Sequence, residues 1–88
     1  MLLAIDIGNS NVTLGVFQGQ RLRMRAKASV QTRRSADEYA AMFYDLLRLH
    51  GIGREEIDGC ILSSVVPAVT GLVEAAARTV AAVPVVRV

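Results

Sequence analysis

The chain has 88 residues, of which 52% are hydrophobic and 20% are charged, and its formal net charge is +2. This composition is typical of one small globular domain, excludes a disordered chain, and gives no indication of a nucleic-acid partner. The single cysteine excludes an internal disulfide, and no apolar run approaches the roughly 20 residues of a membrane helix, so we expect a cytoplasmic protein without a membrane segment.

The first part of the chain predicts three strands. Residues 2–7 are an apolar run without helical spacing, which is typical of a strand buried on both faces. After a turn cluster at 8–11, apolar and β-branched residues resume over 12–17, and a second turn follows at 18–20. Beyond it, basic residues alternate with four apolar ones, which predicts an edge strand with one apolar face: Leu22, Met24, Ala26 and Ala28.

The second part changes to helical spacing. Ser35 and Glu38 form the pattern of a capping box, and an apolar stripe follows until Gly51 ends the helix: Ala36, Tyr39, Ala40, Phe43, Leu46 and Leu47. Residues 60–66 predict a second buried strand. Pro67 suits the first turn of another helix, which Pro84 ends before a last strand begins at 85–88.

The resulting order is strand, strand, strand, helix, strand, helix, strand. Two hairpins followed by crossovers predict an α/β fold, with a mixed five-stranded sheet on which the helices pack. We expect residues 1–88 to form a single subdomain. Because the chain stops inside an apolar strand, we also expect it to be cut from a larger protein.

The turn after the first strand is the candidate site. It reads Asp6-Ile7-Gly8-Asn9-Ser10-Asn11, and it lies between two buried strands. Gly8 would permit a backbone geometry and a close approach that a side chain obstructs, and consecutive amides in such a bend can form an anion-binding nest. The same residue types are also common in plain turns, so the pattern alone leaves both interpretations open.

Asp6 favours a metal-bridged ligand over a bare anion. A carboxylate repels a polyphosphate unless a divalent cation lies between them, and Mg²⁺ bridges carboxylates to phosphates while keeping several waters. We therefore expect Asp6 to hold Mg²⁺ directly or through water. The turn is neither a Walker loop, since no Gly-Lys-Ser/Thr is present, nor a Rossmann fingerprint, since no helix follows it.

Three segments together resemble the type III pantothenate kinases, a family within the actin, Hsp70 and sugar-kinase superfamily. They are the turn at 6–11, Ser35-Ala36-Asp37-Glu38-Tyr39 at the start of the first helix, and Ser63-Ser64-Val65-Val66-Pro67 between strand and helix. They occur in the family's order and span nearly the whole chain. The resemblance implies a ribonuclease-H-like subdomain of the actin-like ATPase kind, and it implies that this chain is the N-terminal part of a two-domain kinase.

The resemblance also implies an activity, namely ATP-dependent phosphorylation of pantothenate in the first step of coenzyme A biosynthesis. It implies a homodimer that uses Mg²⁺ and a monovalent cation, K⁺ or NH₄⁺. The positions that match the family's ATP-contacting stretch are Asp6, Ile7, Gly8, Asn9, Ser10, Asn11, Val12 and Thr13. Ser10 replaces the family's commoner Thr and retains the hydroxyl.

The family's pantothenate-binding motif, catalytic Asp and monovalent-cation Asp would lie beyond residue 88. We therefore expect no catalytic residue in this chain, and no appreciable kinase activity from it alone, because phosphoryl transfer needs the acceptor held in line. Two alternatives remain: a nonenzymatic regulatory or interaction domain that keeps the fold, and another sugar-kinase-like member of the superfamily. A second Gly, common in sugar kinases where Asn9 stands, is absent here, which favours pantothenate.

Several other residues carry open interpretations. Ser63 and Ser64 either cap the helix that follows or face a cleft. Arg33 and Arg34 either face a cleft or are loop charges, and the basic residues of the third strand are expected to be solvated. We expect Cys60 to be a small core residue, and we assign no catalytic role to His50.

Overall fold

The computed structural model describes residues 1–88 and contains one sheet of five strands. The strands are β1 (Leu2–Ile7), β2 (Asn11–Gln18), β3 (Arg21–Ser29), β4 (Gly59–Ser64) and β5 (Val85–Arg87). Their spatial order is β3-β2-β1-β4-β5. The first three strands pair antiparallel, whereas β4 pairs parallel with both β1 and β5, so the predicted mixed sheet is confirmed.

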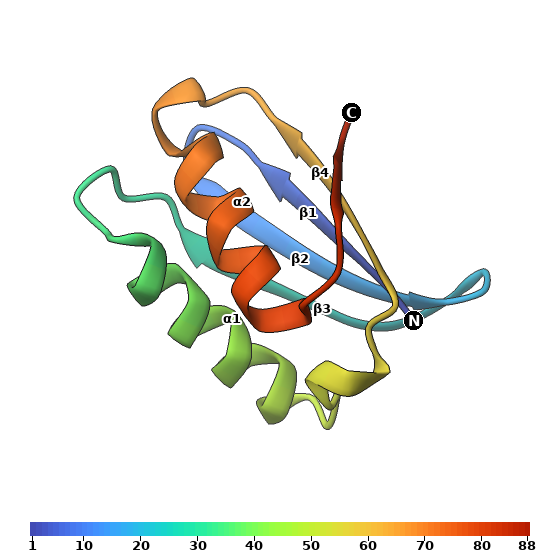
Figure 1. Cartoon of the computed structure of the whole chain (residues 1–88). Coiled ribbons are helices and arrows are strands. Elements are labelled where there is room, and N and C mark those ends of the chain that lie inside the picture. Colours follow the sequence, from blue (N-terminus) through green and yellow to red (C-terminus); the bar gives the residue numbers. More distant parts are fainter.

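Two helices, α1 (Ala36–Leu49) and α2 (Pro67–Ala81), cover the same face of this sheet (Figure 1). The predicted capping box starts α1: the Ser35 hydroxyl accepts from the Glu38 amide at 3.1 Å, and the Glu38 carboxylate accepts from the Ser35 amide at 2.8 Å. These two bonds lower the pKa of Glu38. Pro67 opens α2 at its first turn, where its missing N–H costs nothing. Neither helix is long and apolar enough to cross a bilayer.

The core lies between the sheet and the two helices. It is one cluster of 22 buried residues, all of them apolar. Strand alternation supplies the sheet side, because side chains two residues apart share a face. The fully or almost fully buried residues of the two central hairpin strands are Leu3, Ile5, Ile7, Val12, Leu14 and Val16.

The opposite face of the sheet is open, which corrects one prediction. We expected β1 to be buried on both faces, but Leu2 is 40% exposed and Asp6 is also exposed, with Ala4 half-buried between them. The reason is that α1 and α2 both pack on the other side (Figure 1). Within this chain, nothing covers the second face of β1.

A β-bulge in β3 corrects a second prediction. The strand alternates as predicted up to a point, with Met24 and Ala26 buried. Between Met24 and Leu22 the register with β2 shifts by one residue, so that Met24 faces Val16 and Leu22 faces Phe17. The extra residue is Arg23, whose guanidinium donates to the Gln18 side chain at 2.6 Å. Leu22 is therefore on the open face, 50% exposed, and not on the apolar face we assigned to it.

Candidate functional site

The site is built around the turn between β1 and β2. The Gly8 amide donates to the Asn11 carbonyl at 2.9 Å, which closes the turn, and the Ser10 carbonyl accepts from the Val30 amide at 3.0 Å. The backbone amides of Asn9 and Ser10 make no hydrogen bond within the chain. Two neighbouring donors are thus free at an exposed bend. Such exposed donors are available to water or to an anion.

The eight predicted residues divide by the direction of their side chains. Ile7 and Val12 are 0% exposed, so they can offer only backbone groups to a ligand. The side chains that reach the surface are those of Asp6, Asn9, Ser10, Asn11 and, half-buried, Thr13. Asp6 and Thr13 line a hollow on one face of the sheet, and Asn9 lines a separate one, so the structure divides the predicted polar groups between two hollows.

Gly8 differs from its prediction. Its φ is not positive, and a Cβ built on it would meet only the Asn11 carbonyl oxygen, at 3.6 Å, which is ordinary contact. No residue of the turn takes a left-handed conformation, so a nest of alternating handedness does not form. The fold of the chain itself therefore does not require glycine here. One part of the prediction stays untested: that glycine at position 8 lets a ligand approach the backbone closely.

Asp6 lies on the open face of the sheet, near the C-terminal ends of the parallel strands β1 and β4. Its register partners are Thr13 on β2 and Ser63 on β4. These three residues share one wall of a hollow of about 460 Å³. Its other lining residues are mainly apolar or small: Ala4, Ile5, Gly15, Phe17, Leu22, Arg25, Ile61 and Val88. The open face therefore combines a polar end with an apolar floor.

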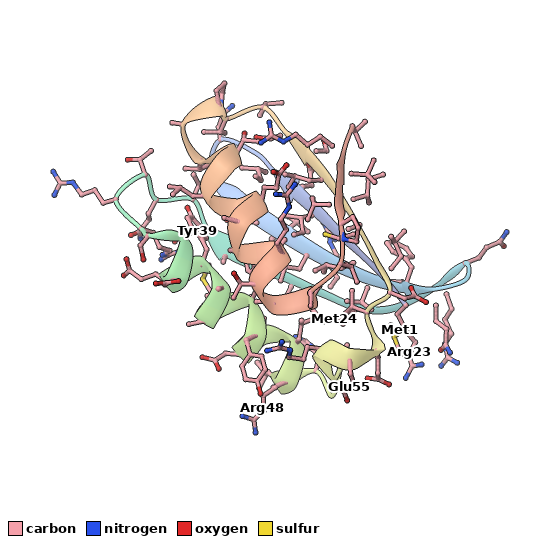
Figure 2. The ribbon with its side chains drawn as sticks, viewed as in Figure 1. Met1, Arg23, Met24, Tyr39, Arg48 and Glu55 are labelled. Atoms are coloured by element: carbon pink, nitrogen blue, oxygen red, sulfur yellow. The ribbon has the colours of Figure 1, made fainter.

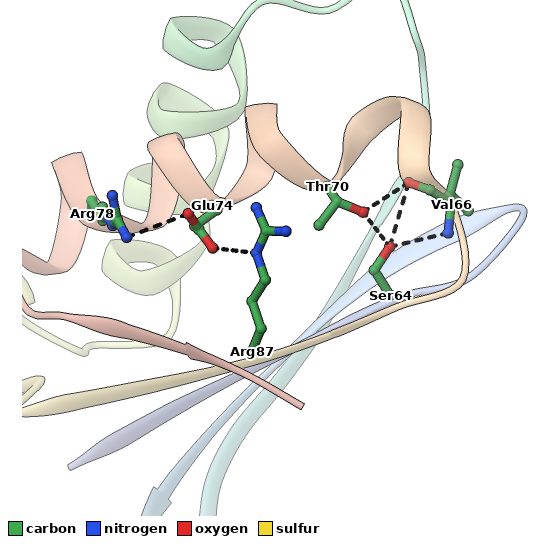
Figure 3. Close-up of polar contacts among 6 residues, drawn as sticks. All are labelled: Ser64, Val66, Thr70, Glu74, Arg78 and Arg87. Atoms are coloured by element: carbon green, nitrogen blue, oxygen red, sulfur yellow. Dashed lines mark hydrogen bonds and ion pairs between the residues drawn. The ribbon is translucent and has the colours of Figure 1, made fainter.

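The two serines at the end of β4 have separate roles. Ser64 is half-buried, and its hydroxyl accepts from the Val66 amide at 3.0 Å and from the Thr70 hydroxyl at 2.8 Å (Figure 3). It holds the segment that leads into α2, but the N-cap of this helix is Val66, which makes no side-chain cap bond, so the capping interpretation is not confirmed in its strict form. Ser63 points to the open face beside Asp6 and makes no hydrogen bond in the chain. Sequence reasoning left these two serines open, and only the parallel pairing of β1 with β4 distinguishes them.

Farther along α2, the Arg87 guanidinium donates to Glu74 at 2.5 Å, and Arg78 lies 3.4 Å from the same carboxylate (Figure 3). The hydrogen bond from Arg87, followed by its charge and that of Arg78, lowers the pKa of Glu74. This group ties β5 to α2. It lies on the helix-covered side of the sheet and takes no part in the site around Asp6.

The loop between β3 and α1 lies beside the turn between β1 and β2, since residues 30–33 and Asn9 line the same hollow. Tyr39 holds it: the phenol donates to the Gln31 carbonyl at 2.9 Å and accepts from the Gln31 amide at 3.1 Å, at the start of α1 (Figure 2). Arg34 folds back over the Tyr39 ring and donates to the Ser29 carbonyl, so it is a structural loop charge. Arg33 lines a second hollow of about 430 Å³ together with Asn9.

The residues at the turn fit a water-rich divalent cation. The chain has no cluster of three or more His, Cys, Asp or Glu that could enclose a metal. Within residues 6–13, Asp6 is the one carboxylate, and it is exposed and without a protein partner. Mg²⁺ is commonly held by one or two carboxylates plus substrate phosphates, with water in the remaining positions. Asp6 can supply the carboxylate of that set, while the two free amides can donate to a phosphate. Cys60, in contrast, is buried, and burial raises the pKa of its thiol to about 11, so it is the core residue we predicted.

Comparison with solved structures defines the class. The chain superposes on a ROK hexokinase from Thermus thermophilus with a TM-score of 0.70, at 16% identity, over 99% of this chain and 32% of the hexokinase. It superposes on RuvC from Thermus thermophilus with a TM-score of 0.62, at 21% identity, over 98% of this chain and 59% of RuvC. The fold is therefore ribonuclease-H-like, of the actin-like ATPase kind, as predicted.

Sequence comparison then defines the family. The model of the type III pantothenate kinase family matches residues 2–88. A type III pantothenate kinase from Roseiflexus sp. (strain RS-1) is 46% identical over 79 residues, and one from Geobacter sulfurreducens is 45% identical over 74 residues. This chain belongs to the type III pantothenate kinase family. It spans 31% of the first relative and 29% of the second, while 90% and 84% of this chain are matched.

Proposed function

We propose that this chain supplies the Mg²⁺–ATP phosphate-binding part of an enzyme that phosphorylates pantothenate, the first step of coenzyme A biosynthesis. The observation that carries the proposal is the turn itself. In this member of the family, the exposed Asp6 carboxylate has no protein partner, and the turn that follows it in the chain holds two backbone amides without acceptors. In the free protein water hydrates these exposed groups, and a phosphate with its bound cation can replace that water.

Each group has a distinct task. The amides of Asn9 and Ser10 donate to phosphate oxygens, and the side chains of Asn9, Ser10 and Asn11 add neutral donors. Asp6 holds Mg²⁺ directly or through water; when bound, the cation neutralises charge on the phosphate oxygens. Without it, a carboxylate about 4 Å from one phosphate charge would repel it by about 4 kcal/mol near a protein surface, a factor of about a thousand in affinity.

The remaining parts of the enzyme are placed outside residues 1–88. We propose a second domain that completes the ATP cleft and carries the pantothenate site, the catalytic Asp and the site for K⁺ or NH₄⁺. The open face supports this, since large apolar side chains remain exposed there, with Leu22 at 50% and Val86 at 61%. We further propose a cytoplasmic homodimer, and no appreciable turnover by the 88-residue chain alone.

The Asp6→Asn variant of the full-length kinase tests the proposal with two readouts of opposite sign. We expect the affinity for Mg²⁺–ATP to fall at least about tenfold, and the affinity for ATP in EDTA to rise, because the repulsion by the carboxylate is removed. Isothermal titration calorimetry measures both, alongside turnover of pantothenate. Unchanged affinity under both conditions and unchanged turnover would count decisively against the assignment. Robust turnover by the 88-residue chain would refute the division into two domains.

A further inference from the structure

Asp6 belongs to a row of four polar side chains that crosses the open face of the sheet. Its register partner on β2 is Thr13, and its partner on β4 is Ser63. Thr13 is paired in turn with Lys27 on β3. Four strands thus contribute one polar side chain each, at the same level of the sheet. The neighbouring level on the same face is apolar or small at its centre, with Gly15, Ala4 and Ile61.

The hydroxyl of Ser63 is available, unlike that of its neighbour. Ser64 exchanges hydrogen bonds with Val66 and Thr70 and is committed to the start of α2. Ser63 is exposed, lines the open-face hollow, and has no hydrogen-bond partner in the chain. It contributes nothing to the core. The fold therefore places a free hydroxyl directly beside the free carboxylate without using it.

The spacing of the strands matches the size of a hydrated cation. Neighbouring strands lie about 4.8 Å apart. A cation on the Asp6 carboxylate carries its waters about 2.1 Å away, and each water can donate a hydrogen bond of about 2.8 Å. A hydroxyl on the adjacent strand, at the register position of Asp6, is therefore within reach of the water shell of a cation held there. Its own proton is then free for a phosphate oxygen.

We propose that Ser63 is a positioning residue of the nucleotide site: it orients the water shell of the cation that Asp6 holds, from the side opposite Thr13. This inference rests on the proposed function and extends it to a strand outside the 6–13 stretch. The site then has three walls, from β2, β1 and β4. Because Ser63 acts through water, its loss weakens metal–nucleotide binding without affecting folding.

The 88-residue chain is small enough for the test by NMR, with Mn²⁺–ADP as the probe. Paramagnetic Mn²⁺ should broaden the amide signals of Asp6, Thr13 and Ser63 first. We expect Ser63→Ala to raise the dissociation constant for Mn²⁺–ADP about three- to tenfold, the effect of one lost hydrogen bond, and Ser63→Thr to restore it. Thr79→Ala, on the exposed side of α2, is the matched control and should bind as the parent chain does. All variants should melt at the same temperature to within about 2 °C.

Three possible results distinguish a failure of the role of Ser63 from a failure of the proposed function. If Asp6→Asn weakens binding and Ser63→Ala does not, the role of Ser63 is refuted and the proposed function stands. If neither Asp6→Asn nor Ser63→Ala changes the binding of Mn²⁺–ADP, by this chain or by the full-length kinase, both proposals fail. If Ser63→Thr binds as poorly as Ser63→Ala, the hydroxyl is not the active group, and the positioning role is refuted.

Discussion

Replacing Gly8 with alanine should separate the stability of the chain from its binding of nucleotide. The φ of Gly8 is not positive, and the new methyl group would lie 3.6 Å from the Asn11 carbonyl oxygen. The Gly8 amide keeps its bond of 2.9 Å to that oxygen. Alanine at such a compatible position reduces the freedom of the unfolded chain, so we expect Gly8→Ala to stabilise the fold by about 0.4–1 kcal/mol.

That free energy corresponds to a measurable change in melting temperature. An unfolding entropy of about 2.1 cal/mol/K per residue gives about 185 cal/mol/K for this chain, so the melting temperature should rise by about 2–5 °C. Nucleotide binding should change in the opposite direction. The methyl group would occupy the space through which phosphate approaches the free amides, and we expect the dissociation constant for Mg²⁺–ADP to rise at least about tenfold.

Circular dichroism melts and calorimetric titration of the same samples give the two quantities. Gly71→Ala is the matched control: Gly71 lies in α2, and a Cβ there meets no atom within 4 Å. It should stabilise by about 1 kcal/mol, as alanine does in a helix, and leave binding unchanged. Destabilisation by Gly8→Ala of more than about 1 kcal/mol would refute the geometry of the turn. If Gly8→Ala stabilises the fold and leaves the nucleotide affinity unchanged, then glycine is not needed at this position for the approach of phosphate.

Three further predictions concern stability and reactivity. Tyr39→Phe removes both bonds to Gln31, at 2.9 and 3.1 Å, and should cost about 1–3 kcal/mol in urea unfolding, with faster hydrogen exchange of the Gln31 amide. Burial raises the pKa of Cys60 to about 11, so iodoacetamide at pH 8 should alkylate the folded chain at least about a hundredfold more slowly than the urea-unfolded chain; equal rates would contradict the burial. The hydrogen bond from Arg87 lowers the pKa of Glu74 below its ordinary 4.5, so the pair stabilises the fold above that pH and loses its effect as pH falls through the lowered pKa. Glu74→Gln should therefore flatten the dependence of melting temperature on pH below 4.5, and an unchanged slope would contradict the pairing.

Local patterns in the sequence were sufficient to predict the elements. Three of these patterns involve only residues close together in the chain, so they can be recognised from the sequence alone: strand alternation, the Ser35–Glu38 capping box and Pro67. The prediction for Leu22 was wrong because a bulge depends on the partner strand. Arg23 continues the basic alternation, and nothing in the run itself marks it as the extra residue.

The candidate site was predictable only where it is local. The residue types of the turn at 6–11 by themselves indicate a possible phosphate site, and the family resemblance supports that interpretation. Ser63 lies 57 positions after Asp6, and its place beside that carboxylate follows from the register of a parallel strand pair. The register between β1 and β4 cannot be predicted from the local sequence of either strand. The open face of β1 was missed for a related reason: an apolar run indicates burial on both sides, whereas both helices of this chain pack on one.

Thr13, Asp6 and Ser63 stand on β2, β1 and β4, the three inner strands of the five. Each of these strands is paired along both edges, so fraying at β3 or β5 leaves these three residues in place, and opening one of the inner strands requires the rupture of two ladders at once. A ligand that docks on these three residues would meet a preorganised surface and would lose little conformational entropy. The rigidity of this part of the proposed site is a property of the sheet's interior and needs no closure of a mobile loop.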